Sequence, residues 1–299
     1  MKSRSNIYIG PAGWSYPDWK GIVYPVKKSK DFSELLFIAR YFNTIEINST
    51  FYRLPSLQSV ENWSRVRSIN PDFLFVVKLW QRFTHTDAPI SQEEADRFRQ
   101  AIDPLQKKNI LGSLLIQFPW RFKNSSQAIE RVLALKKAFR LYPVNLEFRH
   151  GSWNDPKTIS ILKENDLGFV NIDQPLIGKS LPRTVFLTSP TGYFRMHGQN
   201  RENWFKENSG RDARYNYLYS QNELETLITD IKKVADKAER TFIIFNNHFR
   251  GQAVVNGLQM MAKLYQTNPK VPVSLLRAYP LLSKTCVAEN DGMPMDLFS

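Results

Sequence analysis

Short apolar runs alternate with longer amphipathic runs along the whole chain, and this alternation is the main signal in the sequence. The apolar runs have the length of strands, and several carry a polar residue at every second position. They cover residues 6–10, 44–48, 73–78, 112–117, 144–149, 168–173, 193–197 and 241–246. Helical periodicity follows at 32–41, 91–108, 126–139, 156–164, 221–239 and 253–265.

Eight strands that alternate with helices over roughly 260 residues predict an α/β protein, specifically a (β/α)8 TIM-type barrel in a single domain. We expect residues 1–280 to form the barrel and residues 281–299, where the periodicity ends, to form a short C-terminal tail. A doubly wound open sheet is the alternative. That fold would need a glycine-rich phosphate turn after a strand, and the sequence contains no G-x-G-x-x-G.

Polar residues gather at the carboxyl ends of the predicted strands, on one face of each strand. Because helices cover the outside of such a barrel, we expect the polar face to point inward, at the end where this fold places its active sites. The residues expected to converge there are Glu46, Lys78, Glu147, Arg149, Asp173, Arg195 and His197. A ring of salt bridges that only closes the barrel mouth is the alternative, although apolar residues often stabilise a core equally well.

Composition and charge bear on the partner of the protein and on its cellular compartment. The 299 residues include 41 basic and 28 acidic side chains, a net charge of +13. This excess indicates a polyanionic partner, although the basic residues are spread along the whole chain and also fit a solvated basic surface. The single cysteine, Cys286, excludes an internal disulfide framework. No apolar run reaches bilayer length or follows the N-terminus as a signal peptide would, so we expect a cytoplasmic protein without membrane contact.

Aromatic, amide and basic side chains near the strand ends are the expected substrate-binding groups. They are Trp14, Asn48, Tyr52, His85, Gln117, Arg149, Trp153, Arg195, Asn246, Asn247, Arg250 and Gly251. Arg250 and Gly251 belong to the eighth βα loop, where backbone N–H groups at a helix N-terminus often bind phosphate. A helix start that simply needs a glycine explains Gly251 equally well.

Several segments together resemble the YecE-like family, which carries domain of unknown function 72. The matching pieces are residues 10–16 (GPAGWSY) with Trp19, 44–55 (TIEINSTFYRLP), 75–78 (FVVK) with Thr84 and His85, 117–119 (QFP), 147–150 (EFRH) with Trp153, 195–198 (RMHG) and 245–248 (FNNH) with Gly251 and Asn256. The resemblance covers residues 7–265. It implies a TIM-type barrel and a similarity to endonuclease-IV-like and sugar-isomerase-like barrels, but it names no reaction.

The first functional interpretation is an enzyme that acts on a phosphorylated or nucleic-acid substrate, as a hydrolase or endonuclease does. Lys78, Arg149 and Arg195 would hold the anion. Glu46 or Glu147 would be the general base, and His197 would be a proton donor or shuttle. This interpretation requires no cofactor. The expected catalytic residues are Glu46, Lys78, Glu147, Asp173 and His197. In a variant of it, Lys78 forms a Schiff base, provided that nearby groups depress its pKa.

Two alternatives remain open. Glu46, Glu147, Asp173 and His197 could bind Mg²⁺ or Mn²⁺ in a sugar isomerase or hydrolase, although the cations in the same mouth would compete. The chain could also be a non-enzymatic module that binds nucleic acid or protein. Residues 295–298 (MDLF) are similar to the peptide by which bacterial DNA-processing proteins dock in the sliding clamp, but Pro294 replaces its glutamine. Leu297 and Phe298 packing on the barrel itself is the alternative.

Overall fold

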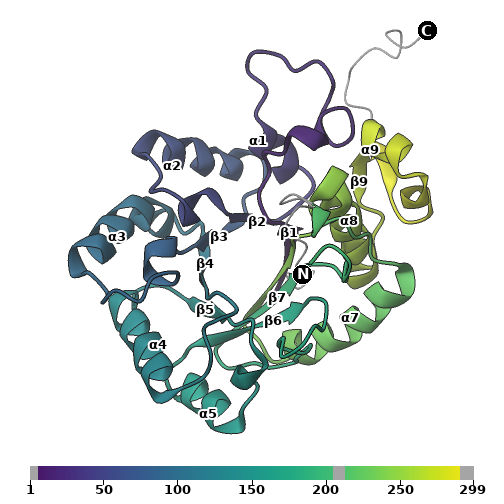
Figure 1. The fold of residues 1–299 in the computed structure, drawn as a ribbon. Coiled ribbons are helices and arrows are strands. Elements are labelled where there is room, and N and C mark those ends of the chain that lie inside the picture. Colours follow the sequence, from purple (N-terminus) through teal and green to yellow (C-terminus); the bar gives the residue numbers. More distant parts are fainter. Residues whose placement is uncertain (1–5, 205–212, 290–299) are drawn as a thin grey trace, which may run out of the picture.

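Eight parallel strands form the centre of the protein and are surrounded by helices (Figure 1). The computed structural model describes residues 6–204 and 213–289. Each strand pairs with the next in sequence from β2 to β8, and β8 pairs with β1. The strands are β1 (Ile7–Pro11), β2 (Thr44–Ile47), β3 (Leu74–Lys78), β4 (Leu111–Gln117), β5 (Val144–Glu147), β6 (Gly168–Asp173), β7 (Thr191–Met196) and β8 (Arg240–Phe245). The predicted TIM-type barrel is confirmed.

The seam between β1 and β2 closes the barrel. Ala12 forms a parallel bridge with Glu46, and the Gly13 N–H donates to the Glu46 carbonyl oxygen at 2.9 Å. Gly10 makes this approach feasible, because a Cβ atom there would lie 1.8 Å from the Thr44 carbonyl oxygen. Closure matters for function because Glu46, a predicted site residue, belongs to the seam itself.

Helices form the outer ring, and side-chain caps define where most of them begin. The helices are α1 (Glu34–Ala39), α2 (Leu57–Ser64), α3 (Gln92–Lys107), α4 (Ser126–Ala138), α5 (Pro156–Glu164), α7 (Gln221–Ala235) and α8 (Gln252–Tyr265). The N-cap side chain accepts a backbone N–H at Ser33, Ser56, Ser91, Ser125, Asp155 and Ser220. Each cap satisfies one backbone donor that the first helical turn leaves unpaired. Short 3-10 helices follow several strands, among them η2 (Ser49–Phe51), η4 (Gln81–Phe83), η5 (Gly151–Trp153) and η6 (Phe249–Gly251).

Strand alternation separates the apolar core from the polar interior on most strands. On β7, Phe194 and Met196 face outward and pack with Leu224 and Leu227 of α7. The opposite face of the same strand places Tyr193 and Arg195 inside the barrel. The predicted inward polar face is therefore correct for β7, and it is also correct for β2 and β5, where Glu46 and Glu147 point inward.

Strand β6 is the exception, and here the sequence prediction is wrong. Its polar residues face outward, onto residues 174–190, which cross from β6 to β7 without a helix. The Asn171 side chain donates to the Phe186 carbonyl oxygen at 2.9 Å and accepts the Phe186 N–H at 2.8 Å. An irregular segment has backbone N–H and C=O groups without hydrogen-bond partners. A helix in the same place would pair these groups internally. The polar face of β6 supplies the partners here, and Val170 and Ile172 fill the interior instead.

The chain continues past α8 and packs on the barrel as far as Glu289. It forms β9 (Lys270–Pro272), α9 (Val273–Ala278), the 3-10 helix η7 (Pro280–Lys284) and β10 (Val287–Glu289), which pairs in parallel with β9. Leu282 is fully buried, and Arg40 at the end of α1 forms a 2.9 Å ion pair with Glu289. Leu297 and Phe298 lie outside the described residues. Within the described residues, every helix is too short or too polar to span a bilayer.

We expect Gly10→Ala to destabilise the protein by at least about 3 kcal/mol, because the methyl group would overlap the β2 backbone and force the seam apart. Denaturant unfolding measures this change. Gly151→Ala is the comparison, since its nearest neighbours would lie at 3.3 Å and need to move by only a few tenths of an ångström, and we expect a cost of about 1 kcal/mol, well below that of Gly10→Ala. Equal costs for the two variants would contradict the proposed role of Gly10 in closure.

Candidate functional site

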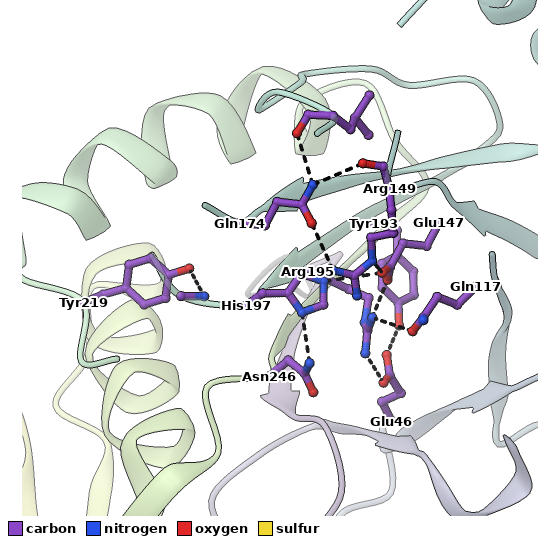
Figure 2. A network of polar contacts seen from close by, with 12 residues as sticks. Glu46, Gln117, Glu147, Arg149, Gln174, Tyr193, Arg195, His197, Tyr219 and Asn246 are labelled. Atoms are coloured by element: carbon purple, nitrogen blue, oxygen red, sulfur yellow. Dashed lines mark hydrogen bonds and ion pairs between the residues drawn. The ribbon is translucent and has the colours of Figure 1, made fainter. Parts of the chain in front are cut away.

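A buried arginine joins two carboxylates at the centre of the barrel mouth (Figure 2). Arg195 Nη2 lies 2.7 Å from Glu46 Oε1, and its Nη1 forms a second ion pair with Glu147 Oε2. The Tyr193 hydroxyl donates to the other oxygen of Glu46 at 2.9 Å. At most 1% of each of the three charged side chains is exposed. Strands β2, β5 and β7 are thus tied together by one charged group.

A second arginine engages the remaining oxygen of Glu147. Arg149 Nε lies 2.6 Å from Glu147 Oε1, and Arg149 Nη1 donates to the Gln174 side chain at 3.0 Å. Burial alone would raise the pKa of Glu147, but Arg149 and Arg195 hold it well below its usual range. Glu147 is therefore a charged counter-ion.

His197 lies beside this cluster and is neutral. Its Nε2 is 3.4 Å from Glu147 Oε1, and the Asn246 side-chain amide donates to its Nδ1 at 2.9 Å (Figure 2). Burial and the nearby Arg149 lower the pKa of His197 to about 3. With Nδ1 as the acceptor, the proton resides on Nε2 and points toward Glu147. His197 can donate a hydrogen bond, but it holds no second proton to transfer at neutral pH.

Lys78 lies at the end of β3, next to the charged cluster. Its Nζ lies 4.2 Å from the centroid of the Phe51 ring, and the Thr50 hydroxyl fixes its carbonyl oxygen at 2.6 Å. Among residues 6–204 and 213–289, no carboxylate forms an ion pair with it. Burial and the positive charge of Arg195 lower its pKa to about 8.

A cavity of about 1150 Å³ opens above this cluster. Lys78, Gln117 and Arg195 line its deep part. Its walls combine polar residues with several aromatic ones, among them Trp14, Tyr16, Phe51, Tyr52, Trp63, Tyr215 and His248. A neighbouring cavity of about 420 Å³ reaches Arg149, and both share Gln117, Arg214 and Tyr215 as lining residues. The two cavities form a polar mouth with aromatic sides, which suits a ligand with an anionic part and a flat part.

His85 lines the same cavity and is also neutral. Burial and the positive charges of Lys78 and Arg121 lower its pKa to about 4. The Thr84 hydroxyl lies 2.8 Å from its Nδ1, and the Phe51 ring packs edge-on against it at 5.0 Å. A neutral imidazole that reaches a cavity is able to accept a proton.

The structure brings twelve of the expected site residues to the mouth and places five elsewhere. Those at the mouth are Trp14, Glu46, Asn48, Tyr52, Lys78, His85, Gln117, Glu147, Arg149, Arg195, His197 and Asn246. Those elsewhere are Asp173, Trp153, Asn247, Arg250 and Gly251.

Asp173 follows the outward polar face of β6. Its Oδ2 accepts a 2.6 Å hydrogen bond from the Tyr219 hydroxyl, and Tyr219 belongs to the apolar cluster beneath α7. Burial raises the pKa of Asp173. The prediction that Asp173 joins the other charges in the cleft is therefore wrong.

Trp153 and Asn247 are structural residues beneath the mouth. Trp153 is fully buried and stacks on Phe148, and its indole N–H donates to the Phe122 carbonyl oxygen at 2.8 Å. The Asn247 amide donates to Asn256 at 2.9 Å and also bonds the backbone of the segment before α7. The donor groups of both side chains are engaged within the protein, and neither residue lines the cavities of the mouth.

The eighth βα loop does not form the expected phosphate cradle. The Arg250 N–H donates to the Asp18 carboxylate at 2.5 Å, and the Gly251 N–H donates to the His248 carbonyl oxygen at 3.1 Å. Gly251 has a φ of +82°, and a Cβ atom there would lie 2.6 Å from Val23. The glycine therefore serves the turn and its close packing, which corrects the expectation that it admits a phosphate.

Sequence reasoning missed several residues of the mouth. Tyr193 shares the face of Arg195, so strand alternation could have identified it. Phe51, Gln174 and Arg214 lie in short turns or irregular segments, where periodicity carries no information about direction. Only coordinates could reveal their position.

The described part of the chain holds no group of three or more His, Cys, Asp or Glu side chains arranged around a common point. Glu46 and Glu147, which the metal hypothesis required, are engaged by arginines.

We expect Arg195→Met to cost about 3–5 kcal/mol of folding stability, because it leaves the buried Glu46 without a counter-charge and removes one of the two arginines that pair with Glu147. Adding Glu46→Gln should recover part of the loss. Lys108→Met is the control: it breaks an exposed pair with Glu61 and should change stability by less than about 1 kcal/mol. Denaturant unfolding of the variants provides the comparison, and similar losses at Arg195 and Lys108 would contradict the counter-ion role.

We expect acid to destabilise the wild-type protein partly through His197. The pKa of this group is about 3 in the folded state and near 6.5 when solvated, so the unfolded state binds more protons between these values. Stability is therefore full above pH 6.5 and falls as the pH decreases, by about 2 kcal/mol between pH 7 and pH 5 from this group. Unfolding curves of wild type and His197→Asn at both pH values test this. An identical pH dependence in the variant would contradict the assignment.

The comparisons with known proteins agree with this architecture. The family model described as "Protein of unknown function DUF72" matches residues 8–279. The UPF0759 protein YunF of Bacillus subtilis is 31% identical over 272 residues, which cover 86% of this chain and 94% of that protein. Two solved DUF72 family proteins each align with 87% of this chain. That of Thermotoga maritima is 33% identical, with a TM-score of 0.75 over 99% of its length, and that of Enterococcus faecalis is 26% identical, with 0.76 over 95%. The chain belongs to the DUF72 family, as its YecE-like motifs indicated.

Proposed function

We propose that the barrel mouth is the active site of an enzyme whose substrate carries phosphate, either a phosphorylated small molecule or a nucleic acid. The observation that carries this proposal is the Lys78 ammonium group, which lines a large cavity and has no carboxylate partner among the described residues. Lys78, Arg149 and Arg195 supply three positive charges, whereas Glu46 and Glu147 supply two negative charges. An anionic ligand would balance this local excess.

The charged groups of the mouth have different roles in this proposal. Arg195 is fixed by two ion pairs, so it provides an immobile positive potential at the bottom of the cavity. Lys78, Arg53 and Arg214 line the cavity without an ion pair among the described residues, so they are the cations available to contact phosphate oxygens directly. Because Glu147 is committed to Arg149 and Arg195, the proton acceptor for a hydrolytic step is the neutral His85.

Aromatic residues at the rim favour a substrate with flat rings, such as unpaired bases. Tyr52 is 63% exposed and lines the larger cavity, and Trp120 is 42% exposed and lines the smaller one. Stacking on such residues contributes about 1–3 kcal/mol per unpaired base. A concave mouth admits intact duplex poorly unless a nucleotide is flipped out. Single strands are therefore the form of nucleic acid that the mouth fits.

We expect chelator-treated protein to bind sulfate, with an affinity that falls as the pH rises through about 8, where Lys78 loses its charge. Lys78→Met should weaken binding by about 10- to 100-fold, the range for a charged hydrogen bond, and should remove this pH dependence. Lys232→Met, which removes a lysine on the exposed face of α7, is the control of equal charge. Isothermal titration calorimetry measures the affinities. Equal losses in the two variants, or binding that needs manganese, would contradict the proposal.

We expect single-stranded oligonucleotides to bind more tightly than duplex of the same sequence, and all binding to weaken as salt rises, because phosphate contacts release counterions. Tyr52→Ala should weaken single-strand binding by about 1–3 kcal/mol and leave duplex binding unchanged. Leu141→Ala, an exposed residue at the opposite end of the barrel, is the control. Fluorescence anisotropy across a salt series measures the affinity for each oligonucleotide. Binding that is equal for both forms and insensitive to Tyr52→Ala would favour a small phosphorylated substrate.

A further inference from the structure

The arrangement of counter-ions around Lys78 has a chemical consequence. Glu46 and Glu147 are the acidic groups that act electrostatically on Lys78. Both form ion pairs with arginines, Glu46 with Arg195 and Glu147 with Arg195 and Arg149. The carboxylates that would normally stabilise a lysine cation at this place are thus already engaged.

The surroundings of the Lys78 amine are those of a nucleophile. Its Nζ sits over the Phe51 ring, and Thr50 holds the backbone carbonyl of the same residue, so the side chain starts from a fixed point at the end of β3. The amine also lines the 1150 Å³ cavity, where a ligand can reach it. An amine becomes nucleophilic when it is partly desolvated and lies near other cations.

The charge state of Lys78 agrees with this geometry. Burial and Arg195 lower its pKa from 10.5 to about 8. At pH 7 this shift increases the neutral fraction of the amine by roughly 300-fold over a solvated lysine. A lower pKa also makes an amine intrinsically less nucleophilic, so the net gain in reactivity is smaller, on the order of tenfold or more.

We propose that Lys78 forms an imine with an aldehyde or ketone group of the phosphate-bearing substrate. The neutral amine attacks the carbonyl carbon, and a C–N bond forms as the carbonyl π pair moves to oxygen. Proton transfers give a neutral carbinolamine, which expels its oxygen as water. The C=N bond then closes with the nitrogen lone pair, and no electrons are gained or lost overall. The inference rests on the proposed function for the phosphate and extends it by naming the reacting carbonyl group.

Two features of the cavity support the proton transfers and the choice of substrate. His85 is neutral and lines the same cavity, and the positive charge of Lys78 is one cause of its lowered pKa, so a neutral imidazole is available near the amine to relay a proton. Arg214 lines the cavity as well, and its Nε has no hydrogen-bond partner among the described residues. A carbonyl carbon on Lys78 and a phosphate on Arg214 define a phosphorylated carbonyl compound as the substrate class.

Reductive trapping tests this inference. Full-length protein is incubated with glycolaldehyde phosphate and cyanoborohydride, which reduces an imine to a stable secondary amine, and peptide mapping locates the adduct. We expect the Lys78 adduct to exceed that of exposed lysines such as Lys232 by on the order of tenfold. Excess sulfate should suppress the Lys78 adduct selectively. Parallel incubations use unphosphorylated glycolaldehyde and an oligonucleotide with an abasic site, to distinguish a small molecule from a nucleic acid as the source of the carbonyl group.

Lys78→Arg separates the imine from anion binding, because it keeps the charge and removes the nucleophile. We expect this variant to bind sulfate and to lose the selective adduct. Adducts distributed evenly over exposed lysines in wild type, unaffected by sulfate, would overturn the imine. If, in that case, sulfate still binds wild type but not Lys78→Met, the proposed anion site remains supported although the imine is rejected. If wild type binds no sulfate, the proposed function itself fails.

Discussion

The ion pairs of Arg195 with Glu46 and Glu147 are the interaction on which the mouth of this barrel depends. A buried guanidinium is costly unless its charge and its hydrogen bonds are both satisfied. Two carboxylates from strands β2 and β5 balance its charge and accept hydrogen bonds from both of its terminal nitrogens, while Tyr193 and Arg149 contact the carboxylate oxygens that remain. Strands that are distant in sequence are thereby held in one register, and the charges of the mouth are fixed in place before any ligand arrives.

This arrangement decides which groups remain available for chemistry. Glu147 and Arg195 are held in place by each other, so they shape the electrostatic potential and do not exchange protons near neutral pH. Burial and the arginine charge keep His197 neutral as well. The group that can still change its charge near neutral pH lies one layer further out, at Lys78, with the neutral imidazole of His85 in the same cavity. A rigid, charged layer beneath a reactive layer is the organisation that preorganised active sites require.

Much of this could be predicted from the sequence, because two of its signals are periodic. Strand and helix periodicity predicted the barrel, and strand alternation placed Glu46, Glu147 and Arg195 on inward faces. The same alternation failed at β6, since period two assigns residues to two faces without saying which face is inside. On β6 the orientation depends on residues 174–190, because the irregular backbone of this segment forms hydrogen bonds with Asn171 on the outer face. The eighth loop failed for a similar reason: its N–H groups already have partners, which no pattern in the sequence shows.

The allocation of counter-ions was also beyond the sequence, and it changes the chemistry most. Composition alone suggests that Glu46 and Glu147 would oppose a reactive Lys78 by stabilising its cation. The structure shows that each carboxylate has a closer arginine, and an arginine remains charged at any pH the protein meets, whereas a lysine can lose its proton. When arginines and lysines share a limited number of carboxylates in a buried site, the arginines therefore keep the ion pairs. The lysine is then buried without a counter-ion, and burial disfavours its charged form. In this mouth that effect lowers the pKa of Lys78, so the ion pairs that stabilise the barrel also prepare the Lys78 amine for reaction.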